Sequence, residues 1–332
     1  MLKLSVPTLF VKKNLRSSVL AWLRYISDQP DRNVPRYSLR YMCEQDIPQV
    51  AELRRVNHFD DATSSYSHLL KIDPKCFVVA EAENGLIIAT GALRKIVMDT
   101  YFFSFHVTHK DYRFRGMANH IIKHLFDSRR NCNILGATEI GMLRRNLNFP
   151  HDPYFIQNDF VNIEYEYDTV IDHNLLSSEL PQGVFLDEYQ DSFLGAILDY
   201  DCSVVDYKRE QLVTLNCQDK DSRTFVATKG GFCVGYGTIK PTIQGYGKIG
   251  PLYAENPAIA EAVLKNLLVS FNVKEGLGAQ TLSNNVNANL IFGTFETKRK
   301  NVILSYRLYS KELLMSETKK IYAVFEGECE PF

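Results

Sequence analysis

Arg113, Arg115, Gly116 and Ala118 fall within six consecutive residues that read Arg-Phe-Arg-Gly-Met-Ala. A glycine lets the backbone approach a ligand with no Cβ in between, and a small alanine keeps the next helical turn narrow. The N–H groups at the start of a helix have no partner within that helix, so they attract an anion, and the two arginines add fixed positive charge. These residues therefore predict a binding site for a phosphate group.

The elements predicted around this segment place it between a strand and a helix. Apolar residues recur at helical spacing after it, at Ile121, Ile122, Leu125 and Phe126. Strands are predicted before it and one more after it, at Cys76–Ala82, Leu86–Val97, Tyr101–Val107 and Ile134–Ile140. An ordinary strand-to-helix connection with one glycine is the alternative, but the agreement of strand, loop and helix favours the binding function.

The pattern Arg113-x-x-Gly116-x-Ala118, preceded by Val107-x-His109-x-x-Tyr112, resembles the acetyl-CoA pyrophosphate loop of the GNAT superfamily of N-acetyltransferases. That signature is Gln or Arg, two residues, Gly, one residue, then Gly or Ala. The resemblance implies that acetyl-CoA is bound by the strand before the loop, by the loop itself and by a later asparagine. The implied cofactor-binding residues are Val107, Thr108, Arg113, Phe114, Arg115, Gly116, Met117, Ala118 and Asn148.

Direct attack of an amine on a thioester needs a base for the amine and a proton for the leaving thiolate. In the family the base usually comes from the strand before the loop, so His106 is the first candidate. The alternative is that His106 has a purely structural role in that strand. Glu139, at the end of the following strand, is the second. The family usually supplies a tyrosine as the acid; Phe155 falls at the counted position, and Tyr154, one residue earlier, is the candidate here.

The chain is predicted to contain two similar domains, because strand-rich segments ahead of one helix recur. Residues 1–35 form an N-terminal extension, 36–170 a catalytic domain, 171–183 a linker and 184–332 a second domain. The second domain resembles the degenerate C-terminal domain of two-domain GNAT proteins. Its equivalent loop, Ile249 to Asn256, has no basic residue and carries Glu255, which should repel an anion. The expected fold is α+β, a tandem GNAT fold in which each domain is a mixed, mainly antiparallel twisted sheet flanked by helices.

Composition excludes several other classes of protein. A formal net charge of -1 provides no basic excess for a general nucleic-acid binder. No apolar run is long enough to cross a membrane. His120 and His124, one helical turn apart with Asp127 nearby, could hold zinc, but a solvated face of the cofactor helix explains them as well, and no metal is expected.

The seven cysteines are scattered and form no C-x-x-C pair, which indicates a reducing compartment. Before Asp28 the chain carries lysines, arginines and serines but no acidic residue. This composition is typical of a mitochondrial presequence and equally of a solvated N-terminal helix. The expected location is therefore the cytoplasm or the mitochondrial matrix.

The expected activity is that of an acyl-CoA-dependent N-acyltransferase, which moves an acetyl group from acetyl-CoA to a primary amine by direct attack. The acceptor is expected to be a small-molecule amine or a protein lysine. Two alternatives remain open, a pseudoenzyme that binds CoA without transfer and a protein-interaction module.

Overall fold

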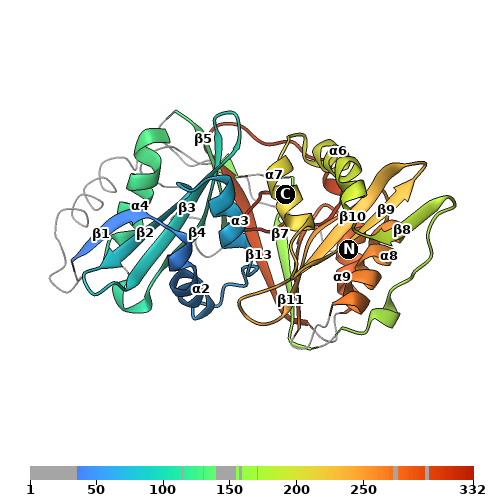
Figure 1. Ribbon diagram of the computed structural model, residues 1–332, viewed down its shortest axis with the longest axis horizontal. Helices are drawn as coiled ribbons and strands as arrows, with labels where there is room; N and C mark the ends of the chain where they lie inside the picture. The colour runs from blue at the N-terminus through green and yellow to red at the C-terminus, as the bar shows by residue number, and fades with distance from the viewer. Residues whose placement is uncertain are drawn as a thin grey trace, which may run out of the picture.

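The computed structural model describes residues 36–113, 115–129, 131–139, 155–156, 159–169, 171–271, 276–295 and 299–332 (Figure 1). The predicted N-terminal extension and three predicted site residues, Phe114, Asn148 and Tyr154, lie outside these ranges. The described strands join into one 14-stranded sheet with the order β1-β2-β3-β4-β5-β13-β7-β12-β11-β10-β9-β8. Two short strands lie off this path, since β14 pairs with β11 and β6 pairs with β13.

The first half of the chain builds five consecutive neighbouring strands. The strands predicted from sequence form within one or two residues of their predicted ends, and the turn at Gly85 has the left-handed φ of +80° that glycine tolerates. A helix that the sequence analysis missed, α3, lies between α2 and β2. The elements of this half are β1 (Tyr37–Tyr41), α2 (Ile47–Arg55), α3 (Ser65–Ile72), β2 (Phe77–Ala82), β3 (Ile87–Val97), β4 (Thr100–Thr108), α4 (Met117–Phe126), β5 (Asn133–Glu139), β6 (Phe155–Ile156) and β7 (Asn162–Tyr167).

The second half repeats the sequence of elements. Asn256 caps α8 as expected, because its Oδ1 accepts a hydrogen bond from the Ile259 N–H at 3.1 Å. The elements of this half are β8 (Val184–Glu188), α6 (Leu194–Val205), α7 (Glu210–Cys217), β9 (Arg223–Lys229), β10 (Phe232–Pro241), β11 (Gly247–Ala254), α8 (Pro257–Ser270), β12 (Leu277–Leu282), α9 (Val286–Gly293), β13 (Arg299–Tyr309) and β14 (Ile321–Ala323).

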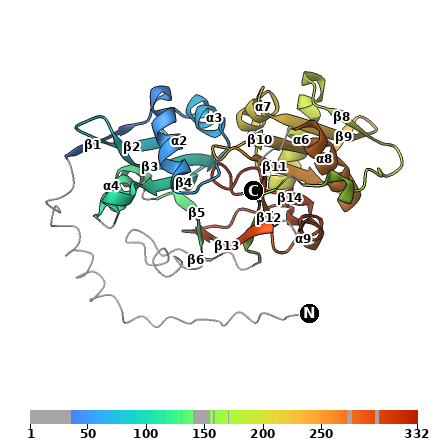
Figure 2. The same ribbon diagram turned by 90° about the horizontal axis from the view of Figure 1, so that it is seen from below.

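The helices cover opposite faces of the sheet because successive side chains of a strand point in opposite directions. Phe77 and Val79 of β2 pack in a core with α2, α3, α6 and α7, whereas Val78 and Ala80 pack against α4. Helices α8 and α9 cover the second half from the side opposite α6 and α7. Figure 2 shows α2, α3 and α7 along one side of the sheet. We call this side, covered by α2, α3, α6 and α7, the α2 face.

The two halves exchange their last long strands. Strand β5 does not pair with β7 of its own half but with β13, which belongs to the second half of the chain. Strand β7 instead lies between β13 and β12, with Glu164 opposite Ile303 on one side and Gln280 on the other. The halves are therefore joined by backbone hydrogen bonds across the middle of the sheet.

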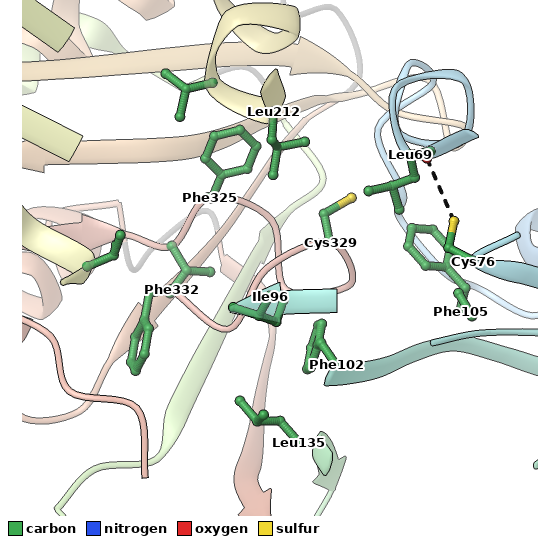
Figure 3. Close-up of a cluster of buried hydrophobic side chains, with 14 of the residues drawn as sticks. Leu69, Cys76, Ile96, Phe102, Phe105, Leu135, Leu212, Phe325, Cys329 and Phe332 are labelled. Atoms are coloured by element: carbon green, nitrogen blue, oxygen red, sulfur yellow. Dashed lines mark hydrogen bonds between the residues drawn. The ribbon is translucent and has the colours of Figure 1, made fainter. Parts of the chain in front are cut away.

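Residues 324–332, which we call the tail, run through the centre of the molecule after β14. The end of the chain lies where the two halves meet (Figures 1 and 2). Figure 3 shows Phe325, Cys329 and Phe332 between Leu212 of α7 and the first-half side chains Ile96, Phe102 and Leu135. The tail is part of the shared core on the α2 face, a role that the sequence analysis did not anticipate.

Candidate functional site

Strands β4 and β5 run parallel and then separate. Their register ends at the pair Phe103 and Gly136, although β4 continues to Thr108 and β5 to Glu139. At the same point β4 contains a bulge against β3, and Phe105 has a φ of +50°, which is unusual for a residue with a Cβ. No strand in the described ranges pairs with β4 or β5 inside this gap. The bulge therefore lies where β4 and β5 begin to separate.

The predicted phosphate loop leads from the end of β4 to the start of α4. Gly116 is the N-cap of α4 with a φ of +80°, and a Cβ placed on it would meet no atom within 4 Å. The space beside the helix start is therefore open. Arg113 Nε donates to the Thr108 carbonyl at 3.3 Å, and its Nη2 donates to Asn57 Oδ1, so the turn after α2 helps to hold the loop.

The equivalent gap in the second half is filled by the chain itself. Strands β11 and β12 pair as far as Ile249 and Ala279, and beyond that point β14 pairs with β11. The Val324 N–H donates to the Gln280 carbonyl of β12 at 2.8 Å, which completes the filling. A Cβ on Gly250 would lie only 2.3 Å from the Phe325 carbonyl oxygen, so a glycine is required for this approach.

The start of α8 also differs from the start of α4. Asn256 accepts the Ile259 N–H from within the chain, and Glu255 pairs with Lys320 at 2.8 Å. The second half therefore lacks the open gap between strands and the open helix start that the first half has.

Comparison with known proteins agrees with this architecture. Residues 197–300 match the model of the acetyltransferase (GNAT) domain family. A protein from Pyrococcus horikoshii with a proposed acetyltransferase role is 16% identical, with a TM-score of 0.65 over 91% of this chain and 99% of that one. A tandem GNAT protein from the clavulanic acid biosynthesis pathway is 10% identical, with a TM-score of 0.59 over 84% of this chain and 100% of that one.

A GCN5-related N-acetyltransferase from Sphaerobacter thermophilus is similar at 14% identity, with a TM-score of 0.56 over 85% of this chain and 98% of that one. No curated protein matches the sequence. The chain has a tandem GNAT fold. The family match covers α6 to the start of β13 of the second half, whereas the open gap and the glycine at the helix start belong to the first GNAT half.

The predicted CoA-binding residues that the structure describes lie between the unpaired end of β4 and the first turn of α4, whereas Phe114 and Asn148 lie outside the described residues. Val107 and Thr108 lie in the part of β4 that has no β5 partner, although both pair with β3 on the other side. Met117 is buried in the core under α4, so its backbone and not its side chain faces a ligand. Ala118 follows it in the first turn of α4.

The two described candidates for the base lie in different surroundings. The His106 ring is 5.8 Å from the Phe103 ring, which packs on Phe126 of α4, so His106 lies on the α4 side of β4. Glu139 is exposed at the end of β5, opposite Ser305 of β13. Each lies beyond the last β4–β5 pair, and their roles remain predictions.

The histidines of α4 contact tyrosines of β1. The Tyr37 hydroxyl hydrogen-bonds to His120 Nδ1, and the Tyr41 ring lies 6.1 Å from the ring of His124. In the described ranges, no group of three or more His, Cys, Asp and Glu side chains is arranged to hold a metal ion. Over the same ranges, no helix combines the length and apolar character needed to span a bilayer.

Sequence analysis missed the tail, which approaches the gap from the α2 face. The Phe105 N–H in the bulge donates to Glu328 Oε2 at 2.6 Å, over a separation of 223 residues. The side chain of Glu328 keeps 29% of its surface exposed and lies 3.3 Å from Arg54 Nη2. No short motif surrounds Glu328, so only the path of the chain reveals this contact.

Proposed function

We propose that the protein transfers an acetyl group from acetyl-CoA to a primary amine and that the first half performs the transfer. The observation that carries the proposal is the β4–β5 gap that leads to the open start of α4 at Gly116, while the second half has its gap filled by β14. One molecule of acetyl-CoA per chain is the expected stoichiometry.

In this proposal the start of α4 binds the pyrophosphate of CoA. Its free N–H groups and the positive end of the helix favour an anion, and Arg113 and Arg115 add charge. The backbone of Val107 and Thr108 directs hydrogen-bonding groups toward the gap, where the pantetheine arm would lie. This arrangement aligns the thioester with the bulge at Phe105.

The acceptor amine is proposed to reach the thioester from the α2 face, opposite α4. The amine must be neutral to attack the carbonyl carbon; the C–N bond forms, the C–S bond breaks, and the thiolate takes a proton. A small-molecule amine and a protein lysine share this chemistry, so both are included in the proposal.

Isothermal titration with acetyl-CoA tests the site through two matched substitutions of Gly116. Asparagine and aspartate both tolerate a left-handed backbone, and the space beside Gly116 accepts either side chain. Gly116→Asn should change the Kd by less than about 3-fold. Gly116→Asp places a carboxylate where the pyrophosphate binds and should weaken binding by at least about 10-fold, or about 1.4 kcal/mol.

Equal affinities of the two variants would contradict the assigned site, and no binding by the unchanged protein would contradict the function. A free-thiol assay with acetyl-CoA and a panel of primary amines then tests transfer. Binding without release of thiol from any amine would favour the alternative of a CoA-binding pseudoenzyme.

A further inference from the structure

Glu328 occupies a position in the tail that differs from those of its two neighbouring glutamates. Glu326 accepts hydrogen bonds from the Ala62 N–H at 2.9 Å and the Ser65 hydroxyl at 2.5 Å, and it is 3% exposed. Glu330 is fully buried with Arg94 and the Tyr207 hydroxyl. Both are enclosed by protein partners, whereas Glu328 keeps accessible surface.

Glu328 has two partners, the backbone N–H of Phe105 in the bulge and the buried guanidinium of Arg54, whose Nη2 lies 3.3 Å from Oε2. Phe105 lies two residues beyond the last β4–β5 pair, so its N–H marks the point where the gap opens. The bond from this N–H fixes one carboxylate oxygen at the bulge, at 2.6 Å. The carboxylate of Glu328 is thereby held at the α2 face of the gap.

A second carboxylate extends this environment along the sheet. Glu164 of β7 is only partly buried and interacts electrostatically with Glu328, Asp60 and Glu166. Lys248 of β11 offsets part of the negative charge and pairs with Asp60 at 2.7 Å. Asp60, Asp61, Glu166 and Glu328 outnumber the two cationic side chains among them, Lys248 and Arg54, so a cationic ligand at the α2 face would meet net negative charge.

We propose that Glu328 binds the ammonium group of a cationic acceptor at the β4–β5 gap and takes its proton before attack on the thioester. This inference rests on the proposed function. It is argued from the position of Glu328 and not from any evidence against His106 or Glu139. It assigns the base to a group that the hydrogen bond from Phe105 already positions. The acceptor class that it implies is a primary amine that carries positive charge.

The steps balance without another reactant. The ammonium transfers a proton to Glu328, the neutral nitrogen attacks the acetyl carbon, and the C–S bond breaks as the amide forms. The second proton lost by the nitrogen goes to the CoA thiolate, and Glu328 returns its proton to water. The net products are the amide, CoA thiol and one proton.

The groups around Glu328 act on its pKa in both directions, with a net rise. Burial raises the pKa of Glu328, and Asp61, from the segment after α2, raises it further. Arg54 of α2, the Phe105 N–H and Lys248 of β11 oppose that rise in pKa. Glu164 of β7 interacts with Glu328, but burial raises its own pKa to about 8, so it is mostly protonated near neutral pH and adds little charge. A base with a raised pKa retains more driving force for proton transfer.

The test compares Glu328→Gln with Glu330→Gln in the full chain. The amines are spermidine, lysine methyl ester and a lysine-containing peptide, and release of CoA thiol is followed from pH 6 to 10. Glu328→Gln should lower kcat/KM at pH 7 by at least about 100-fold, in the range typical of a lost general base. The Kd for acetyl-CoA should stay within about 3-fold, which also shows that the variant is folded.

The pH profile separates catalysis from a structural role. The rate of Glu328→Gln should rise about tenfold per pH unit as the fraction of neutral amine grows, whereas the unchanged protein should level off earlier. Glu330→Gln should keep the original profile even if it lowers stability, and Glu328→Asp should recover part of the rate. A Glu328→Gln variant with the original profile, or with no greater loss than Glu330→Gln, overturns the inference. Failure of the unchanged protein to use any of these amines would instead count against the proposed function and the inference together.

Discussion

Glu164, near the centre of the sheet, lies in an environment that disfavours its charged form. Burial is the main cause that raises its pKa to about 8 from 4.5, and Asp60 contributes like charge, whereas Lys248 opposes the shift. Between these two pH values the folded state holds a proton that the unfolded state has released. The free energy of unfolding therefore falls as pH rises through this window.

Glu164→Gln should remove this dependence. The stability of the variant relative to the unchanged protein should increase from pH 5 to pH 8, by at most about 1.4 kcal/mol per pH unit. Urea unfolding at each pH measures the difference, and Glu179→Gln, on an exposed segment, is the control. If the free energies of unfolding of the two proteins differ by the same amount at every pH, Glu164 does not titrate in this window.

At the same scale, the sequence predicts some site residues and not others. Arg113, Gly116 and Ala118 are close neighbours in the chain, so their spacing alone indicates a helix start that attracts an anion. Glu328 meets Phe105 across 223 residues, and no local pattern encodes that contact. Sequence reasoning succeeds where the chemistry is local and fails where the fold brings distant residues together.

At the scale of elements, the strands around the phosphate loop were predicted close to their observed ends, whereas α3, α6, β13 and β14 were not predicted. Strand β14 has three residues and α3 has eight, too few for an unambiguous period. Asp46 precedes α2 and is of a residue type that favours helix N-caps, but its carboxylate accepts hydrogen bonds from Arg40 and the Cys43 N–H and does not cap that helix. The hydrogen bonds from Arg40 and Cys43 therefore occupy the carboxylate that could otherwise have capped α2.

Because β14 and the tail fill the gap in the second half, adding one methyl group at Gly250 should lower the stability of the protein. Gly250→Ala places a Cβ 2.3 Å from the Phe325 carbonyl oxygen, and backbone atoms cannot yield as a side chain end can. Overpacking of this kind should lower the free energy of unfolding by about 1–3 kcal/mol or more.

Gly195→Ala in α6 is the matched control. A Cβ there meets no atom within 4 Å, so the substitution should be neutral or stabilise by about 0.5–1 kcal/mol. Urea unfolding measures both variants. Equal stability of Gly250→Ala and Gly195→Ala would show that the tail does not rest against β11 in solution.

At the scale of the whole molecule, the exchange of β7 and β13 makes each half depend on the other. Repetition of elements in the sequence predicted two similar halves, but strand pairing between residues as far apart in the chain as Tyr167 and Arg299 follows from no local pattern. Without β13, strand β5 would expose its edge, and without β7 the same would hold for β12. The tail adds ionic contacts from Glu328 and Glu330 to the first half.

Residues 36–183 and 184–332 should therefore not fold independently. Expressed alone, each fragment should lack a cooperative unfolding transition by circular dichroism, because an unpaired strand edge and an open core remain in each. Expressed together, they should purify as one complex. A protease site inserted near Glu179, on the exposed segment between the halves, is the control, since cleavage after folding should leave the halves associated on size exclusion. Two fragments that each unfold cooperatively as monomers would mean that pairing across β5, β13, β7 and β12 contributes little, and the halves would then be independent domains.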